Sequence, residues 1–178
     1  MFIYILITIA VTVIAFLIVA ARQPDVFRVQ RSTVISAPPA AVFAEVNDFR
    51  QWQLWSPFLE YDRDMTTSYT GAAQGEGAEY TWSGNSKAGQ GKMTIIESRP
   101  NELIRIQLEF IKPFVATNTA EFTFDSDEDR TIVTWAMMGK NNFMFKAMHT
   151  LMNMDKMVGR DFERGLAKLK VVVETGVH

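Results

Sequence analysis

The sequence feature that most constrains the fold is an amphipathic stretch near the C-terminus, from Asn142 to Glu174. It is the longest stretch with helical periodicity and no proline. Its apolar residues recur in steps of three or four, which places them on one face of a helix. They are Met144, Met148, Leu151, Met154, Val158, Phe162, Leu166, Leu169 and Val173. A helix this long and one-sided must pack on another apolar surface, which the preceding segments are expected to supply.

Two glycines, Gly159 and Gly165, interrupt this helical stretch. A glycine inside a helix costs roughly 1 kcal/mol relative to alanine. Gly165 lies close to the apolar stripe. We therefore expect a neighbouring backbone to approach closely at this position, or a ligand to need the room.

The composition fits one domain behind an apolar N-terminal segment. The chain has 178 residues, 48% of them hydrophobic, and a net charge of −2. About 155 residues remain after the N-terminal run, a usual single-domain size with room for a core. A nucleic-acid binder would need a concentrated basic face, so the mild acidity argues against one. The lack of cysteine excludes disulfides, thiolate zinc sites and a cysteine nucleophile.

The run from Met1 to Ala21 contains no charged residue. Twenty helical residues at about 1.5 Å each span about 30 Å, the thickness of the hydrocarbon core of a bilayer. We therefore predict a transmembrane anchor over residues 1–21 and a juxtamembrane linker over 22–27. A cleaved signal peptide is the alternative, since Val19 and Ala21 are small. The run lacks a preceding basic residue and is long for a signal peptide, which favours the anchor.

Basic residues follow the apolar run at Arg22, Arg28 and Arg31. The positive-inside rule places such residues on the cytoplasmic side of a membrane. A single-pass membrane protein with a cytoplasmic globular part is therefore expected.

From Tyr61 to Gly139 the hydrophobic period is two, as in strands with one covered face and one solvated face. Short turns between successive strands indicate antiparallel pairing. Two short helices are predicted after the first strand, over Ala40–Val46 and Trp52–Trp55. The expected strands are Arg28–Ser36, Met65–Thr70, Gly77–Ser83, Gly91–Ser98, Glu102–Lys112, Ala116–Asp125 and Arg130–Met138. The predicted fold is α+β, with a curved antiparallel sheet around the C-terminal helix.

Several short motifs, taken in order, are also similar to a known family. They are Ala37–Phe43, Phe49–Pro57, Gly75–Gly84, Gly91–Ile95, Lys112–Phe114, Asn118–Phe124, Thr134–Trp135 and Met154–Leu166. Their order and spacing resemble the SRPBCC superfamily, also called START-like or helix-grip proteins. The nearest branch is the bacterial one labelled polyketide cyclase/dehydrase and lipid transport. The resemblance covers residues 28–178 and leaves the anchor outside the domain.

This resemblance implies a deep hydrophobic cavity between the sheet and the long helix. Members of the superfamily carry lipids, sterols, hormones or polyketides, and some catalyse cyclisation or dehydration. A shared fold does not by itself fix the function.

The residues show no metal-binding pattern. His149 has no second histidine nearby in the sequence with which to form a metal pair. Three aspartates begin like a calcium loop, but Arg130 stands where that loop needs glycine. They are Asp125, Asp127 and Asp129, and the strands on both sides indicate a hairpin turn. No metal and no cofactor are expected.

Five carboxylates are candidates for acid–base chemistry if they are buried. They are Glu45, Glu79, Glu109, Asp155 and Asp161. No two of them converge by spacing alone, and a solvated or ion-paired role is favoured for each. The sequence therefore assigns no catalytic residue.

Aromatic residues and methionines are concentrated on the apolar strand faces and on the helix. Methionine adapts to irregular shapes and is common at permissive binding surfaces. The simpler interpretation is an ordinary core, but the collective excess favours a pocket for an apolar ligand. The candidate lining residues are Tyr80, Trp82, Phe110, Phe122, Trp135, Met154, Val158 and Phe162.

Three functions remain open. The favoured one is a membrane-anchored module that binds an apolar small molecule or lipid without changing it. The alternatives are a cyclase, dehydratase or hydrolase, and a membrane-tethered interaction or stress protein. The sequence does not indicate an oligomeric state.

Basic residues also recur every four positions along the C-terminal helix, at Lys156, Arg160, Arg164 and Lys168. This basic ribbon would attract an anionic leaflet by about 1 kcal/mol per residue within a Debye length. The favoured interpretation is a solvated face that Asp161 and Glu163 offset.

Overall fold

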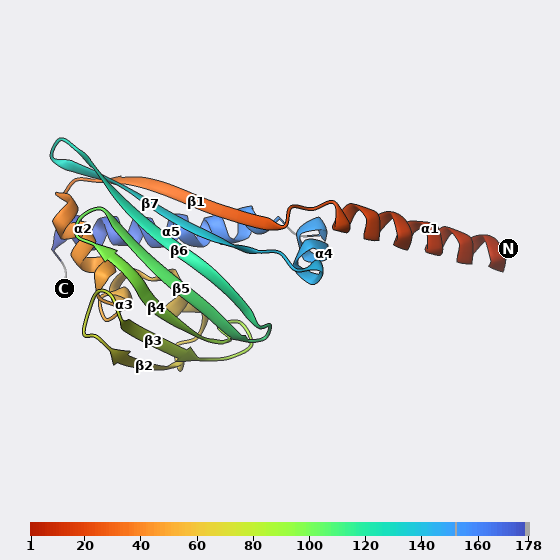
Figure 1. Ribbon diagram of the computed structural model, residues 1–178, viewed down its shortest axis with the longest axis horizontal. Helices are drawn as coiled ribbons and strands as arrows, with labels where there is room; N and C mark the ends of the chain where they lie inside the picture. The colour runs from red at the N-terminus through yellow and green to blue at the C-terminus, as the bar shows by residue number, and fades with distance from the viewer. Residues whose placement is uncertain (152, 177–178) are drawn as a thin grey trace.

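The computed structural model describes residues 1–151 and 153–176. A long apolar helix, α1 (Phe2–Ala21), projects from one end of a domain in which a curved sheet surrounds a second long helix, α5 (Met154–Thr175) (Figure 1). The predicted α+β fold is confirmed, with an N-terminal apolar helix, short helices after the first strand and a long C-terminal helix.

The sheet contains seven antiparallel strands in the order β1-β7-β6-β5-β4-β3-β2. The strands are β1 (Val26–Ile35), β2 (Thr66–Gly71), β3 (Ala78–Ser83), β4 (Gln90–Arg99), β5 (Leu103–Lys112), β6 (Ala116–Asp127) and β7 (Arg130–Lys140). Their ends differ from the predicted ones by at most two residues. Strands β2 to β7 form a continuous meander, and β1 pairs with β7 at the opposite edge from β2.

Three short helical segments connect β1 to β2. They are α2 (Pro39–Asn47), α3 (Trp52–Trp55) and the 3-10 helix η1 (Pro57–Tyr61). Pro39 occupies the first helical position, where a missing N–H costs nothing. Val42 and Val46 of α2 are fully buried, so this helix closes one end of the sheet.

The C-terminal apolar stretch forms two helices, α4 (Phe143–Leu151) and α5. The prediction of one continuous helix from Asn142 is therefore wrong. Asn153 is extended, and its side chain accepts a hydrogen bond from the backbone N–H of Lys156 at 2.9 Å, which starts α5 afresh. Asparagine is among the strongest N-caps because its side chain satisfies one of the free N–H groups of the first turn. Helix α4 instead packs against α1.

The core lies between α5 and the concave face of the sheet. Phe162, Leu166 and Leu169 of α5 are at most 2% exposed. They meet inward-facing side chains of the strands, among them Ile104, Ile106, Phe122 and Val133. This is the burial that the amphipathic sequence of α5 requires.

An ion cluster fixes the first half of α5 to β1. The guanidinium of Arg31 donates to Glu163 at 2.7 Å and to Asp155 at 3.1 Å. It lies over Gly159, where an added Cβ would overlap it. Hydrogen bonds with Asp155 and Glu163 raise the pKa of Arg31, and Arg31 in turn lowers the pKa of Asp155. Gly159 therefore makes room for this side chain.

Gly165 has a comparable role one and a half turns further along α5. A Cβ built at this position would lie 2.8 Å from Cζ3 of Trp135 and 2.9 Å from Cδ of Pro57. The sequence predicts that a backbone or a ligand comes close to Gly165. In the structure, side chains make this close approach instead.

We expect Gly165→Ala to destabilise the chain. Overpacking costs about 1–3 kcal/mol, which exceeds or offsets the gain of about 1 kcal/mol in helix propensity. Thermal unfolding of the detergent-solubilised chain, followed by near-ultraviolet circular dichroism, measures the change. Ala167→Gly on the exposed face is the matched control and should cost about 1 kcal/mol through propensity alone. A Gly165→Ala protein more stable than the wild type would contradict this packing.

Candidate functional site

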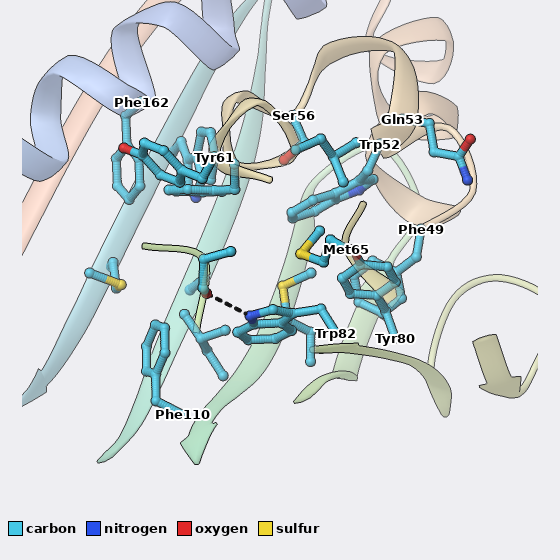
Figure 2. A pocket seen from close by; sticks show the side chains of 18 of the residues that line it. Phe49, Trp52, Gln53, Ser56, Tyr61, Met65, Tyr80, Trp82, Phe110 and Phe162 are labelled. Carbon is cyan, nitrogen blue, oxygen red and sulfur yellow. Dashed lines mark hydrogen bonds between the residues drawn. The ribbon is translucent and has the colours of Figure 1, made fainter. Parts of the chain in front are cut away.

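A cavity of about 250 Å³ lies between the sheet, α5 and the segment that contains α3 and η1. Figure 2 shows its side chains converging from these elements, with Phe162 of α5 opposite Phe110 and Trp82 of the sheet. Six of the eight predicted lining residues lie on its wall. They are Tyr80, Trp82, Phe110, Trp135, Val158 and Phe162.

The other two predicted residues do not contribute to the wall as described. Phe122 is fully buried and stacks behind Trp135, with ring centroids 4.9 Å apart and an angle of 26°. The side chain of Met154 lies outside the described residues, as does Met152. The part played by any of these residues in binding a ligand stays a prediction.

A large part of the wall comes from a segment to which the sequence analysis assigned no lining residues. The residues of this segment are Phe49, Trp52, Gln53, Ser56, Phe58, Leu59, Tyr61 and Met65. Aromatic residues occupy every third position there, at 49, 52, 55, 58 and 61. That spacing puts side chains on one face of a helical segment, and it was the available signal.

The aromatic wall is organised around Trp135 of β7. Its indole stacks on Phe162 with centroids 4.1 Å apart and planes 10° apart. Trp55 meets its edge at 5.8 Å and 82°. Stacked and edge-to-face pairs add about 0.5–1.5 kcal/mol each beyond burial. The wall at this end is therefore a rigid layer of rings.

Trp135 also carries an unusual polar atom. Of the four tryptophans, three donate their indole N–H to a backbone carbonyl. Figure 2 draws one of these bonds, from Trp82 to Ala88 at 3.0 Å. The Nε1 of Trp135 is buried, and no described residue accepts its hydrogen. Buried polar groups are nearly always paired, so this donor is an exception that calls for an acceptor.

The opposite corner of the indole is closely packed. The Cζ3 corner of Trp135 faces Gly165 and Pro57, neither of which lines the cavity as described. Nε1 lies across the indole from this corner. On α5 the cavity is lined by Val158 and Phe162, which precede Gly165. Nε1 is therefore on the edge of the indole that lies away from Gly165 and Pro57.

Few other polar groups reach the cavity. The hydroxyl of Tyr61 donates to Asp161 at 2.7 Å, and Asp161 also accepts from Arg164 at 2.8 Å. Burial, followed by the hydrogen bond to Asp161, raises the pKa of Tyr61 to about 12. Burial likewise raises the pKa of Tyr80 to about 12. Both phenols are therefore neutral at physiological pH.

The candidate carboxylates lie away from the described cavity wall. Lys92 pairs with Glu79 at 3.3 Å and with Glu109 at 3.6 Å. Asp155 is bound by Arg31, and Asp161 lies behind Tyr61. Glu45 is buried in α2 and is not part of the described wall. In the described part of the wall, Lys87 is the charged side chain, and aspartate, glutamate and histidine are absent.

Solved structures of other proteins share this fold. Protein CV1439 from Chromobacterium violaceum has a TM-score of 0.59 and 16% identity, covering 85% of this chain and 99% of that one. TTHA0849 from Thermus thermophilus has a TM-score of 0.59 and 13% identity, with coverages of 85% and 100%. The Aha1 dimer from Colwellia psychrerythraea gives 0.57 and 15%, with coverages of 85% and 99%. At these identities the likeness concerns the fold alone.

A comparison with curated proteins finds no match. The sequence model of the family described as polyketide cyclase / dehydrase and lipid transport matches residues 26–174. The match spans the whole sheet and nearly all of α5 and leaves out α1. It confirms the resemblance to the SRPBCC superfamily seen in the sequence motifs. The chain therefore belongs to the polyketide cyclase/dehydrase and lipid-transport family.

Proposed function

We propose that this protein is a membrane-tethered binding module that holds an apolar small molecule or lipid in its cavity without changing it chemically. The observation that carries this proposal is the composition of the described wall, which is almost entirely aromatic and aliphatic. Ligand sites are typically concave and apolar, with a few polar groups that set the orientation. The family description, which includes lipid transport, supports the same class of ligand.

The tether is α1. It is long and apolar enough to cross a membrane, although a signal sequence passes the same test. The hydroxyls of Thr8 and Thr12 each donate to a carbonyl four residues earlier at 2.8 Å, so they are satisfied within the helix. Ala20 is fully buried against the domain, which supports a retained helix over a cleaved one. Arg22 and Arg28 follow α1 and favour a cytoplasmic domain.

The shape of the wall favours a flat ligand. Tyr80 and Trp82 are stacked at 6.1 Å and 19°, and Phe110 meets Trp82 edge-on at 5.9 Å. In the second stack of the wall, Phe162 and Phe122 cover the two faces of Trp135, so Phe162 is the ring with a face left for a ligand. Flat aromatic faces make large contact areas with planar apolar molecules. An aromatic or polycyclic ligand therefore suits this cavity better than a thin hydrocarbon chain.

The free N–H of Trp135 adds one polar requirement. A ligand oxygen that accepts this hydrogen bond would satisfy the buried donor once the side chains around Nε1 move to admit it. A carbonyl group on an otherwise apolar skeleton has the required chemistry.

The neutral phenols support binding over proton abstraction. With its pKa raised to about 12, Tyr61 is protonated at neutral pH and cannot act as a base. The described wall supplies no carboxylate or imidazole for that role. On this part of the wall the enzyme alternative is left with Lys87 and the neutral phenols.

Filling the cavity should abolish binding of an apolar dye. Val158→Trp puts an indole into the space, whereas Val171→Trp makes the same change on the same helix at a residue that is 59% exposed. We expect phenylnaphthylamine to bind the fragment beginning at Gln23, and Val158→Trp to weaken it at least about tenfold, or about 1.4 kcal/mol. Fluorescence titration measures the affinity. Equal affinities in a folded Val158→Trp protein and the control would refute the assigned cavity.

The free indole donor should select for a carbonyl. Trp135→Phe removes the N–H and keeps an aromatic ring in the stack. We expect this change to weaken the ketone dye Prodan by about 0.5–1.5 kcal/mol more than phenylnaphthylamine, which has no carbonyl. The comparison of the two dyes cancels the change in cavity shape. An identical loss for both dyes would show that the N–H makes no bond to the ligand.

Tyr61 and Tyr80 should ionise late in an alkaline titration. The folded pKa values of Tyr61 and Tyr80 are about 12, above the value of about 10 for an unfolded tyrosine. Their contribution to stability is therefore complete below pH about 10 and is lost as the pH rises towards the folded values. Tyrosinate absorbance follows the titration, and Tyr61→Phe and Tyr80→Phe should each remove one late component. A folded chain in which all phenols ionise near pH 10 would contradict this burial.

A further inference from the structure

Large apolar side chains are exposed where α1 joins the domain. Val115 is 81% exposed and Phe143 is 53% exposed, although neither belongs to α1. Three more exposed apolar residues lie on the same two segments, the end of β5 with its turn to β6 and the start of α4. We call the whole set the apolar collar, and it consists of Ile111, Phe114, Val115, Phe143 and Met144. Exposed apolar groups clustered in this way mark an interaction surface.

The two halves of the collar are joined to each other. The ring of Phe114, in the β5–β6 turn, meets the ring of Phe145, in α4, with centroids 6.5 Å apart and an angle of 77°. In Figure 1 the β5–β6 turn and α4 lie at the end of the domain from which α1 projects. The two halves of the collar are therefore in contact through this pair of rings.

The collar is also fixed to the root of α1. Asn141, two residues before α4, donates its backbone N–H to the carbonyl of Asp25 at 2.8 Å and its side-chain amide to that of Pro24 at 3.0 Å. Lys146 of α4 pairs with Asp25 at 2.6 Å. Helix α4 itself packs against α1. The predicted linker over 22–27 is thus held by these bonds, and its last two residues belong to β1.

The charges around the collar suit a lipid headgroup region. Arg22, Lys112 and Lys140 are exposed and adjoin α1, the β5–β6 turn and the end of β7. The basic ribbon on α5 is less suitable, because Arg164 and Lys168 both pair with Glu60. An apolar surface bordered by basic residues is typical of protein that lies in a membrane interface.

We propose that the apolar collar is a membrane-contact face, seated in the headgroup and acyl boundary of the leaflet that α1 enters. This inference rests on the proposed membrane tether. Its occupant is lipid because the collar is continuous with an apolar helix that is long enough to span a bilayer. Interfacial apolar faces are buried by about 5–10 Å.

Because the chain has no cysteine, single cysteines can report its depth in a membrane. The full-length chain is reconstituted in phosphatidylcholine and phosphatidylglycerol vesicles and labelled with a nitrobenzoxadiazole dye. Val115→Cys and Met144→Cys report the collar, and Ile9→Cys reports the middle of α1. Asp129→Cys, in the exposed β6–β7 turn at the far end of the domain, is the matched control. Quenching by doxyl-labelled lipids measures contact with acyl chains.

We expect blue-shifted emission and loss of emission with doxyl lipids at positions 9, 115 and 144, and neither effect at position 129. If position 9 is quenched but positions 115 and 144 behave like position 129, the proposed membrane contact of the collar is overturned and the tether stands. No quenching at position 9 would overturn the tether itself. A blue shift at positions 115 and 144 without lipid quenching would show that protein covers the collar, and would overturn the lipid assignment.

Discussion

The stacking of Phe162 on Trp135 is the contact on which the rest of the domain depends. It joins α5 to the centre of the sheet, with ring centroids 4.1 Å apart. Such proximity needs Gly165, because any Cβ there would press on the same indole. This pair of rings therefore depends on the glycine in the sequence, fixes the packing of α5 on the sheet and forms part of the aromatic wall of the cavity. A side chain that moved α5 away from Trp135 would loosen the core and reshape the cavity together.

The cavity follows from how α5 is held at two places. Its first turns are clamped to β1 by Arg31, and its middle is held by the ring stack. Between α5 and strands β3 to β5 the space is bridged by the irregular segment that carries Trp52 and Tyr61. Protein interiors are otherwise close-packed. The cavity of about 250 Å³, lined by aromatic rings, is therefore a product of this arrangement of helices and strands. The same geometry leaves the indole N–H of Trp135 without a described acceptor.

The sheet and α5 were predictable because period-two and helical patterns each survive over many residues. The break at Asn153 was not, because apolar steps of three and four continue through it from Met148 to Val158. The apolar residues at these steps pack against two different partners, since α4 packs on α1 and α5 packs on the sheet. Tyr80, Trp82 and Phe110 were identified from the strand pattern. In residues 49–65 the aromatic residues at every third position were a signal of a shared face. Short helical segments have too few turns to show whether that face lines a cavity.

Native mass spectrometry of the full-length chain, released from lipid nanodiscs under mild activation, tests most directly whether this cavity holds a ligand. The protein should be purified from the membranes of the cells that make it, because it then keeps the molecule that it binds in the cell. A ligand-binding module predicts a population carrying one additional apolar molecule of defined mass, lost when the cavity is filled at Val158. A wild-type chain that always appears without an adduct, or an adduct that survives the filled cavity, would contradict it.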